Sequence, residues 1–278
     1  MYAIRAGRPD MGCHNVVACG EKTAAIIAAN RPEFGVRKTD GFLVAALGEM
    51  KIDYERFNKA AHLLETGNVI GGLYGPIMGG YAGGPEGTAI ATIAHHFLGL
   101  LIFKAEWHCY FPFHVLQNCS TMRELLWVYS IVGQALSRNT HLLHSAAPCM
   151  AAGPCTKMVV DELAASSTIA TVSGAHLDIV AVARNKYPGH CTGMEARIAA
   201  DFGHIVAEAG MKREDANEIV QKLLVKYEDN IPNAPIGKHF SECYDITTVT
   251  PSKEYLELYD KKKKELEDMG FDFSLFSH

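Results

Sequence analysis

The stretch Val69-Ile70-Gly71-Gly72-Leu73-Tyr74, followed by Gly84-Pro85-Glu86, is an apolar run that leads into a helix start, and it decides the fold. Three more helix starts follow short apolar runs further along the chain, at residues 121–124, 153–155 and 192–195. The steps between successive starts are 36, 33 and 39 residues. A strand–helix crossover unit takes about 30 residues or more. The spacing therefore predicts an α/β fold of the (β/α)8 TIM-barrel type.

In a parallel barrel the loops after the strands lie at one end, where barrel enzymes carry their active sites. We expect four stretches to form parallel strands, namely residues 69–75, 108–115, 140–147 and 176–183. The loops that follow should gather at one end of the sheet; they are residues 79–84, 118–121, 149–154 and 186–192. Antiparallel pairing among these strands would contradict the barrel.

The number of strands argues against a complete barrel. About six strand candidates can be placed, and the first, residues 2–6, has no helix before it. A closed barrel needs eight. Residues 24–29 fit either a helix or a strand, and residues 42–49 have a helical pattern. Either two strands lie within residues 15–50, or the chain is the C-terminal part of a longer barrel.

No linker or low-complexity segment divides the chain, so residues 1–278 are predicted to form a single barrel domain. After the fourth repeat the strand–helix alternation stops. Two further helices are expected, from residue 213 to 227 and from residue 251 to about 269.

Charge and hydropathy exclude several classes of protein. The 278 residues carry a formal charge of −5, which gives no basic surface for nucleic acid. The start has no apolar signal segment. The most apolar stretch, residues 89–103, is broken by His95-His96 and is shorter than the ~20 residues of a membrane span. The eight cysteines contain no C-x-x-C pair, which favours reduced thiols. The sequence thus predicts a cytoplasmic protein with no membrane and no nucleic-acid partner.

Two features at the loop end are candidates for a binding site. The loop 79–84, which contains Gly80, Tyr81 and Gly83, is either a shaped substrate loop or only a tight turn, and it lacks the Lys-Ser/Thr of a P-loop. His108 lies on the opposite strand face from Cys109. It is either a pocket histidine or a hydrogen-bonded core histidine. A metal site there would have only His114 as a second ligand on the same face.

Charged residues at two helix starts have structural or binding roles. Glu124 and Glu195 each stand three residues after a threonine, as in a capping box, so a structural role suffices for them. Arg123 and Arg197 lie in the first turns of the same helices, at the loop end. They are therefore better candidates for binding an anion or a partner.

Nucleophilic catalysis by a side chain has weak support. No G-x-S-x-G elbow is present for a serine nucleophile. Cys149 and Cys155 lie at a strand–helix junction, where a helix N-terminus can lower the pKa of a thiol. A small buried residue is the commoner role of such a cysteine.

Several stretches, in the same order along the chain, carry a family resemblance. They are Ala6-Gly7-Arg8-Pro9 with Met11-Gly12, Met50-Lys51-Ile52-Asp53, Gly79-Gly80-Tyr81-Ala82-Gly83-Gly84, Trp107-His108, Thr121 with Arg123-Glu124, Gly153-Pro154-Cys155-Thr156, Thr192-Gly193-Met194-Glu195-Ala196-Arg197, Glu242-Cys243-Tyr244-Asp245 and Thr248-Val249-Thr250-Pro251. Together they cover essentially the whole chain. In this pattern the chain resembles the monomethylamine:corrinoid methyltransferases of methanogenic archaea.

The resemblance implies a TIM barrel that forms symmetric homo-oligomers. Such a protein moves a methyl group from a methylamine to the Co(I) of a corrinoid, the cobalamin-type group held by a separate protein, in methanogenesis from methylamines. No cofactor would be bound directly, and the partners would be the corrinoid protein and a small methylated amine. Gly80, Gly83, Arg123 and Arg197 would face the partner or the corrinoid. The family's members are longer at the N-terminus, in agreement with the shortage of strands.

The departures from the family pattern fall on its active site. The family's pyrrolysine, an electrophile that holds the amine, aligns with His14, and its pocket glutamates align with Leu43 and Leu73. A glutamine and a tyrosine of the family fall in Ser145-Ala146-Ala147. Histidine can donate a proton or a hydrogen bond but cannot form the covalent amine adduct. The resemblance therefore assigns catalysis to His14 and no metal. It assigns the substrate site to Tyr81, His108, Leu43, Leu73 and Ser145.

Three hypotheses remain open from the sequence. The leading one is a methyltransferase without pyrrolysine, whose more apolar pocket favours a quaternary or otherwise pre-activated methyl donor. In it, His14 should point into the same mouth as Tyr81 and His108. The second is a non-catalytic remnant that keeps only oligomer and partner surfaces. The third is a metal-dependent barrel enzyme that uses His14, His108 and nearby thiols.

Overall fold

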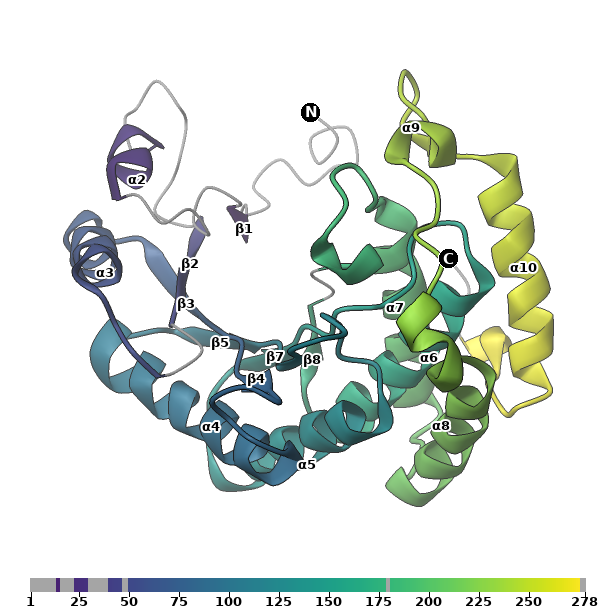
Figure 1. Ribbon diagram of the computed structural model, residues 1–278, viewed down its shortest axis with the longest axis horizontal. Helices are drawn as coiled ribbons and strands as arrows, with labels where there is room; N and C mark the ends of the chain where they lie inside the picture. Colours follow the sequence, from purple (N-terminus) through teal and green to yellow (C-terminus); the bar gives the residue numbers. More distant parts are fainter. Residues whose placement is uncertain (1–13, 16–22, 30–39, 47–49, 179–180, 276–278) are drawn as a thin grey trace.

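The computed structural model describes residues 14–15, 23–29, 40–46, 50–178 and 181–275. Within these residues, six strands form one all-parallel sheet in the order β1-β2-β3-β5-β7-β8. The strands are β1 His14–Asn15, β2 Gly41–Ala45, β3 Val69–Tyr74, β5 Trp107–Tyr110, β7 His144–Ala146 and β8 His176–Leu177. They follow one another along an open arc, with helices on its outer side (Figure 1).

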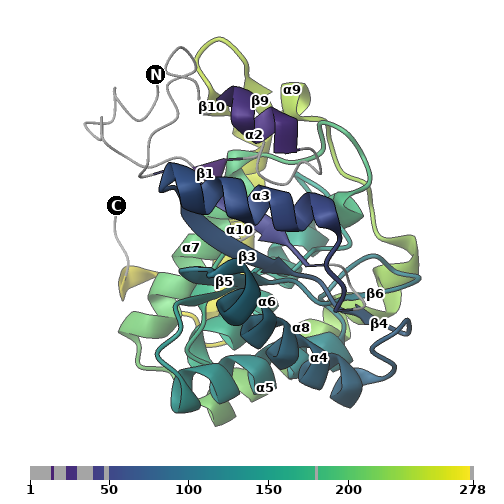
Figure 2. The same ribbon diagram turned by 90° about the vertical axis from the view of Figure 1, so that its left-hand side faces the viewer.

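Helices connect the neighbouring strands. They are α2 Thr23–Ala29, α3 Tyr54–Thr66, α4 Pro85–Leu98, α5 Arg123–Asn139 and α6 Lys157–Val172, and α4 continues into the π-helix η3 Gly99–Phe103. The helices α4 and α5 run side by side along one flank of the molecule (Figure 2). A parallel strand order with a helix in each crossover is the arrangement of a barrel wall.

The C-terminal part of the chain is helical and packs beside α6. It contains α7 Gly193–Glu208, α8 Arg213–Tyr227, α9 Phe240–Cys243 and α10 Lys253–Glu267, together with the short 3-10 helices η4 Ala183–Asn185, η5 Glu228–Asn233 and η6 Phe273–Leu275. Two small ladders complete the described structure. The strands β4 Ile77–Met78 and β6 Phe113–His114 pair in parallel, and β9 Tyr244–Asp245 and β10 Thr250–Pro251 pair antiparallel.

Two of the four predicted helix starts are confirmed. Pro85 is the first residue of α4 after the N-cap Gly84. Thr192 and Glu195 form the reciprocal capping box at the start of α7. The other two starts were placed wrongly. The hydroxyl of Thr121 donates to Glu162, and α5 begins at Arg123 after Met122. In the same way α6 begins at Lys157, three residues after Pro154, because Thr156 is its N-cap.

The parallel pairing predicted for four stretches is confirmed, since β3, β5, β7 and β8 pair in parallel. The helical interpretation of residues 42–49 was wrong, because residues 41–45 form the buried strand β2. The ambiguous stretch 24–29 lies in helix α2. The stretch 108–115 is two strands, β5 and β6, and not one. The strand expected at residues 2–6 lies outside the described residues.

The register of the sheet separates two faces. Tyr74, His108 and Tyr110 point toward the helices, where Tyr110 stacks on Tyr129 of α5. The opposite, inner face carries the alternate residues, which include Leu73 opposite Cys109, and Cys109 opposite Ser145. On this inner face the indole of Trp107 lies across Gly71, where an added Cβ would be 2.2 Å from the ring. Glycine at this position thus lets the tryptophan pack flat on the sheet.

One helical stretch of the described chain, Pro85–Phe103, is 19 residues long and apolar enough to cross a bilayer by length and composition. It is also the helix that covers the outer face of β3 and β5. His95 and His96, on this helix, are fully buried against Tyr74 of the sheet. The other side of this stretch is exposed and carries Ile90, Phe97 and Leu101.

Candidate functional site

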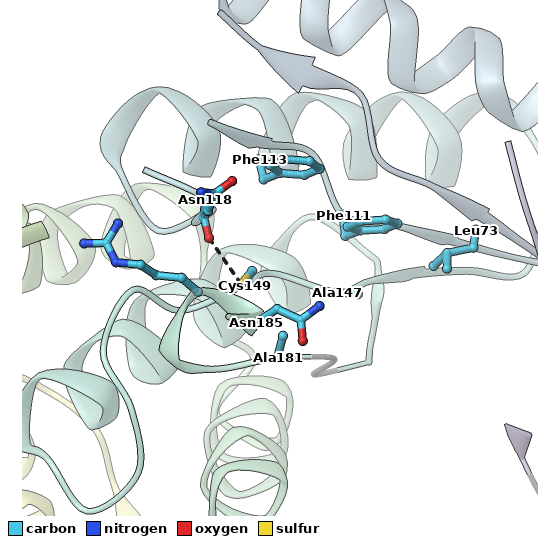
Figure 3. A pocket seen from close by; sticks show the side chains of 9 residues that line it. Leu73, Phe111, Phe113, Asn118, Ala147, Cys149, Ala181 and Asn185 are labelled. Carbon is cyan, nitrogen blue, oxygen red and sulfur yellow. Dashed lines mark hydrogen bonds between the residues drawn. The ribbon is translucent and has the colours of Figure 1, made fainter. Parts of the chain in front are cut away.

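A cavity of about 390 Å³ opens at the carboxyl end of the parallel sheet (Figure 3). Leu73 comes from the end of β3, Phe111 follows β5, and Ala147 follows β7. Cys149 and Ala181 also line the cavity, and they form a parallel bridge beyond the last residues of β7 and β8. The cavity therefore lies where barrel enzymes place their active sites.

The wall of the cavity is mainly hydrocarbon and aromatic. The rings of Phe111 and Phe113 are stacked, with centroids 6.0 Å apart and planes at 9°. Phe111 lies flat over Gly75, where a Cβ would be 2.6 Å from the ring. The polar lining consists of the amides of Asn118 and Asn185 and the side chain of Arg184, and none of the described lining residues carries a carboxylate.

A strained turn forms one side of the cavity. Ala183, Arg184 and Asn185 have φ values of 51°, 60° and 51°, in the left-handed region that costs about 1–3 kcal/mol for a residue other than glycine. The turn is held by the N–H groups of Ala183 and Arg184, which donate to the carbonyls of Ala152 at 2.8 Å and Met150 at 2.9 Å. Strain of this kind persists only where the surroundings fix it, and it is typical of functional sites.

The guanidinium of Arg184 is committed to backbone acceptors. It donates to the carbonyl oxygens of Gln117 and Ile231 and, at 3.3 Å, to the side-chain oxygen of Gln117. Arg184 therefore joins the loop after β6 to the 3-10 helix η5. Its donors are used inside the protein.

Glu162, on α6, is fully buried. Its carboxylate accepts hydrogen bonds from the Thr121 hydroxyl and from the N–H groups of Ala151 at 2.7 Å and Ala152 at 2.9 Å. Burial raises the pKa of Glu162 to about 7, although the three donors and Arg184 oppose this. The sequence analysis missed this residue. The available signal was an acid amid the buried apolar residues of α6.

Of the residues assigned to the substrate site, Leu73 lines the cavity and is 9% exposed. Leu43 is buried on β2, in register with Gly71 of the neighbouring strand. Ser145 lies on the inner face in a separate hollow of about 270 Å³ beside Trp107. His14 belongs to β1, where its backbone is in register with Gly41, and its side chain lies outside the described residues.

The assignment of His108 to the substrate site is corrected by its position. His108 lies on the helix-facing side of β5 and is 1% exposed, so it does not line the cavity. Its Nδ1 is 2.9 Å from the hydroxyl of Tyr74, and its ring stacks on His96. Burial lowers the pKa of His108 to about 4. Of the two interpretations from the sequence, the structure therefore supports His108 as a hydrogen-bonded core histidine.

The glycine loop is a tight turn whose residues are not among those that line the cavity. The N–H of Gly79 donates to the carbonyl of Gly83 at 2.8 Å, and that of Gly83 donates back to Gly80 at 3.1 Å. Gly79 and Gly83 have positive φ, which requires glycine-like freedom. Tyr81 is 76% exposed at the tip and is not among the cavity's lining residues, contrary to its expected place in the mouth.

The two arginines at helix starts differ. Arg123 pairs with Glu228 at 2.7 Å and donates to Gln221 at 2.9 Å, so it fastens α5 to the C-terminal helices. Arg123 thus has a structural contact, while its side chain is 52% exposed, and its partner-facing role stays a prediction. Arg197 is exposed on α7.

The thiols near the cavity are not poised for nucleophilic attack. Burial raises the pKa of Cys149 far above its usual range, and it raises the pKa of Cys155 as well. The Cys149 thiol donates to the carbonyl of Asn118 at 3.5 Å (Figure 3). Within the described ranges, no three His, Cys, Asp or Glu side chains are grouped so that they could hold a metal ion. The described side chains thus give the metal-dependent hypothesis no ligand set.

The parallel sheet with helical crossovers and a cavity at its carboxyl end defines an α/β protein whose sheet has the arrangement of a barrel wall. Comparison with known proteins identifies the family. The model of the family "Monomethylamine methyltransferase MtmB" matches residues 2–271, and the chain belongs to this family.

Relatives from three species of Methanosarcina support this assignment. The chain is 37% identical to monomethylamine methyltransferase MtmB1 of Methanosarcina barkeri over 272 residues, which are 96% of this chain and 58% of that protein. The relative MtmB1 from Methanosarcina acetivorans has the same identity and coverage, and MtmB from Methanosarcina mazei is 36% identical with the same coverage. The chain thus spans 58% of the length of these relatives.

Two solved structures are similar in fold. The crystal structure of the Methanosarcina barkeri enzyme has a TM-score of 0.89 at 36% identity, covering 97% of this chain and 58% of that one. A second crystal structure, of a hydroxylamine complex of MtmB, has a TM-score of 0.90 at the same identity and coverage. These matches confirm the α/β fold with its parallel sheet and the family recognised from the sequence.

Proposed function

We propose that this chain transfers a methyl group from a small methylated amine to the Co(I) corrinoid of a partner protein, as in methanogenesis from methylamines. The observation that carries the proposal is the cavity at the carboxyl end of the sheet, in a chain that belongs to a methylamine methyltransferase family. The cavity is large enough for a molecule of a few heavy atoms. It opens between loops, where a partner protein can reach it.

The chain's share of this reaction is positioning. The corrinoid is a substrate carried by the partner and supplies the nucleophile, so no side chain of this protein needs to attack the methyl group. The stacked rings of Phe111 and Phe113 exclude water and hold the methyl groups. The amides of Asn118 and Asn185 offer carbonyl oxygens that orient the amine. Holding the donor in line with the acceptor is a main source of rate in such a transfer.

The lining favours a quaternary ammonium donor over protonated monomethylamine. Leu73 lines the cavity where the family pattern has a glutamate, and none of the described lining residues supplies a carboxylate for an N–H donor. A quaternary ammonium ion has no N–H to satisfy, and aromatic faces attract it through cation–π interaction. In the family pattern, His14 is the catalytic candidate in place of pyrrolysine.

The test is methyl transfer to a corrinoid protein reduced to Co(I). The purified chain is incubated with mono-, di-, tri- or tetramethylated ammonium, and methyl-Co(III) formation is followed by its visible absorption. Transfer that is fastest with the tetramethylated compound is expected. Transfer only from monomethylamine would contradict the proposed substrate class.

A second candidate function is a non-catalytic member that keeps oligomer and partner surfaces. The observation in its favour is the substitution of His14, Leu43 and Leu73 at the positions of the family's reactive residues. The absence of transfer from all four amines, together with binding of a corrinoid protein, would favour this function.

We further propose a cytoplasmic homo-oligomer in which the described sheet is part of a barrel. Support comes from two features of the surface. The edge strands β1 and β8 each have one neighbour within the described sheet. A surface that we call the α4–α5 face exposes large apolar side chains: Ile90, Phe97, Leu101, Trp127 and Ile131. Gly80, Gly83, Arg123 and Arg197 remain the proposed contacts for the corrinoid protein.

A further inference from the structure

We propose that Glu162 is a positioning residue for the cavity, because its buried carboxylate holds together the loops that carry much of the cavity lining. Three hydrogen bonds reach this carboxylate, and each comes from a segment next to the cavity. The consequence for methyl transfer rests on the proposed function above. The effect on the loops does not depend on it.

The loop after β7 is fixed by two consecutive backbone donors. The N–H of Ala151 donates to one carboxylate oxygen of Glu162 at 2.7 Å, and the N–H of Ala152 donates to the other at 2.9 Å. Two bonds to the two oxygens of a rigid carboxylate set both the place and the direction of the peptide. Cys149, which lines the cavity, lies two residues before this anchor.

The loop before α5 is fixed by the same carboxylate. The hydroxyl of Thr121 donates to Glu162. The adjacent Ser120 N–H donates to the carbonyl of Cys149 at 2.7 Å, and the Cys149 thiol donates to the carbonyl of Asn118. Asn118 and Cys149 therefore keep their relative position in the cavity wall through Glu162.

The strained turn is connected through the anchored loop. Its N–H groups at Ala183 and Arg184 donate to the carbonyls of Ala152 and Met150, on either side of the Ala151 anchor. A shift of the anchored loop would remove the contacts that keep three consecutive residues in the left-handed region. Arg184 and Asn185 would then leave their place in the lining.

The electrostatics of the site support the role. The charged or titratable groups around Glu162 are Arg184, Cys119, Cys149 and Tyr227. Burial raises the pKa of Glu162 from 4.5 to about 7. The hydrogen bonds from Thr121, Ala151 and Ala152 oppose this rise, because each of them favours the charged carboxylate that accepts it.

The experiment is amide hydrogen exchange, read by mass spectrometry on the 278-residue chain. Glu162→Gln replaces one acceptor oxygen by a donor that faces a backbone N–H. We expect exchange of residues 149–153 and 118–121 to become about tenfold faster, since a buried donor then loses its partner.

Glu195→Gln is the matched control. Glu195 is also a buried glutamate, and it accepts hydrogen bonds from Thr192 and Tyr255 at the start of α7. This variant should lose stability without selective opening of the cavity loops. Thr121→Val removes the hydroxyl donor and leaves Glu162 in place. This variant replaces Glu162→Gln in the exchange experiment if Glu162→Gln does not fold. It should open the same segments to a smaller extent.

A second readout links the loops to ligand binding. Tetramethylammonium titrated into the protein and followed by NMR should bind about tenfold more weakly to Glu162→Gln, and with unchanged affinity to Glu195→Gln. If the wild-type chain binds no methylated amine, the proposed function fails. The exchange data alone then decide whether Glu162 holds the cavity loops in place. Unchanged exchange at 149–153 in Glu162→Gln, or equal opening in Glu195→Gln, would overturn the inference.

Discussion

Phe111 is the residue on which recognition of a methylated cation in the cavity depends most directly. Its ring faces the space beside Leu73 and stacks on Phe113. Phe111→Leu keeps an apolar wall but removes the aromatic face, so tetramethylammonium binding should weaken by about 1 kcal/mol, or about fivefold. Isothermal titration calorimetry measures the change. Phe103→Leu is the control, since Phe103 is fully buried in η3 and should lose stability without losing affinity.

His14 is the residue whose change should affect chemistry most and stability least. It occupies the position of the family's reactive group, at the start of the edge strand β1. His14→Ala is expected to abolish methyl transfer to Co(I) corrinoid protein and to change the free energy of unfolding by less than about 1 kcal/mol. Urea denaturation and the transfer assay measure the two effects. Full transfer activity in the variant would remove His14 from the mechanism.

Single residues were predictable where their position in the chain sets their position in space. Leu73 was assigned to the pocket by the family resemblance, and its place near the end of β3 puts it in the cavity lining, because the ends of parallel strands meet at one edge. The alternation of β5 correctly separated His108 from Cys109, but it did not indicate which face was the interior. Glu162 reaches loops from other repeats, and no spacing in the sequence encodes such a contact.

At the scale of elements, the buried histidines between the sheet and α4 should make the free energy of unfolding fall in acid. Burial lowers the pKa of His96 to about 3 and that of His108 to about 4, and His95 and His144 are close to them. A histidine with a depressed native pKa stabilises the fold above its unfolded pKa of about 6.5, and this is lost as the pH falls toward the native value. Each such histidine contributes a slope of up to about 1.4 kcal/mol per pH unit.

The measurement is urea denaturation of wild type and His96→Phe between pH 7 and 4. The variant keeps a ring against Tyr74 and His108 but cannot take up a proton. Its stability should therefore fall less steeply with acid than that of the wild type. Glu162 acts in the opposite sense, since its raised pKa favours the fold at low pH. Parallel curves for the two proteins would show that His96 titrates normally in the folded state.

Helix starts were predictable where no residue from another part of the fold competes for the capping side chain. The pattern of threonine followed three residues later by glutamate occurs at both residues 121 and 192. It forms a capping box at 192, whereas at 121 the buried Glu162 takes the hydroxyl. The strand β2 was mistaken for a helix because a short apolar run has no period of its own until neighbouring strands pair with it.

At the scale of the whole molecule, the repeat of apolar run and helix start was sufficient to predict the parallel sheet. Crossovers of 33 to 39 residues leave room for little else than a strand, a helix and two loops. The spatial order β2-β3-β5-β7-β8 follows the order along the chain, as in a barrel wall. The C-terminal helices α8 and α10 gave amphipathic patterns, but their packing against α6 depends on contacts such as the buried pair Asp161–Lys262, at 2.6 Å.

The surface of the molecule leads to the prediction of self-association. The α4–α5 face is apolar, and its ends carry opposite charges. Exposed Glu86 and Glu124 lie in the first turns of α4 and α5, whereas exposed Lys104 and Arg138 lie at the other ends. Two copies that meet on a two-fold axis through this face place their helices antiparallel. Each acidic end then faces a basic end of the partner copy, and the apolar side chains are covered.

The purified chain should therefore associate at micromolar concentration, as sedimentation velocity over a concentration series can measure. Phe97→Glu places a charge in the centre of the α4–α5 face, where Phe97 is 49% exposed, and should shift the chain toward monomer. Val225→Glu changes an equally apolar residue on α8 that is 82% exposed and lies off this face, so it should leave association unchanged. Association that survives Phe97→Glu would point to β1 and β8, which are the edge strands among the described residues, because strand edges are the other known route to pairing between chains. A wild-type chain that stays monomeric across the series would contradict both routes.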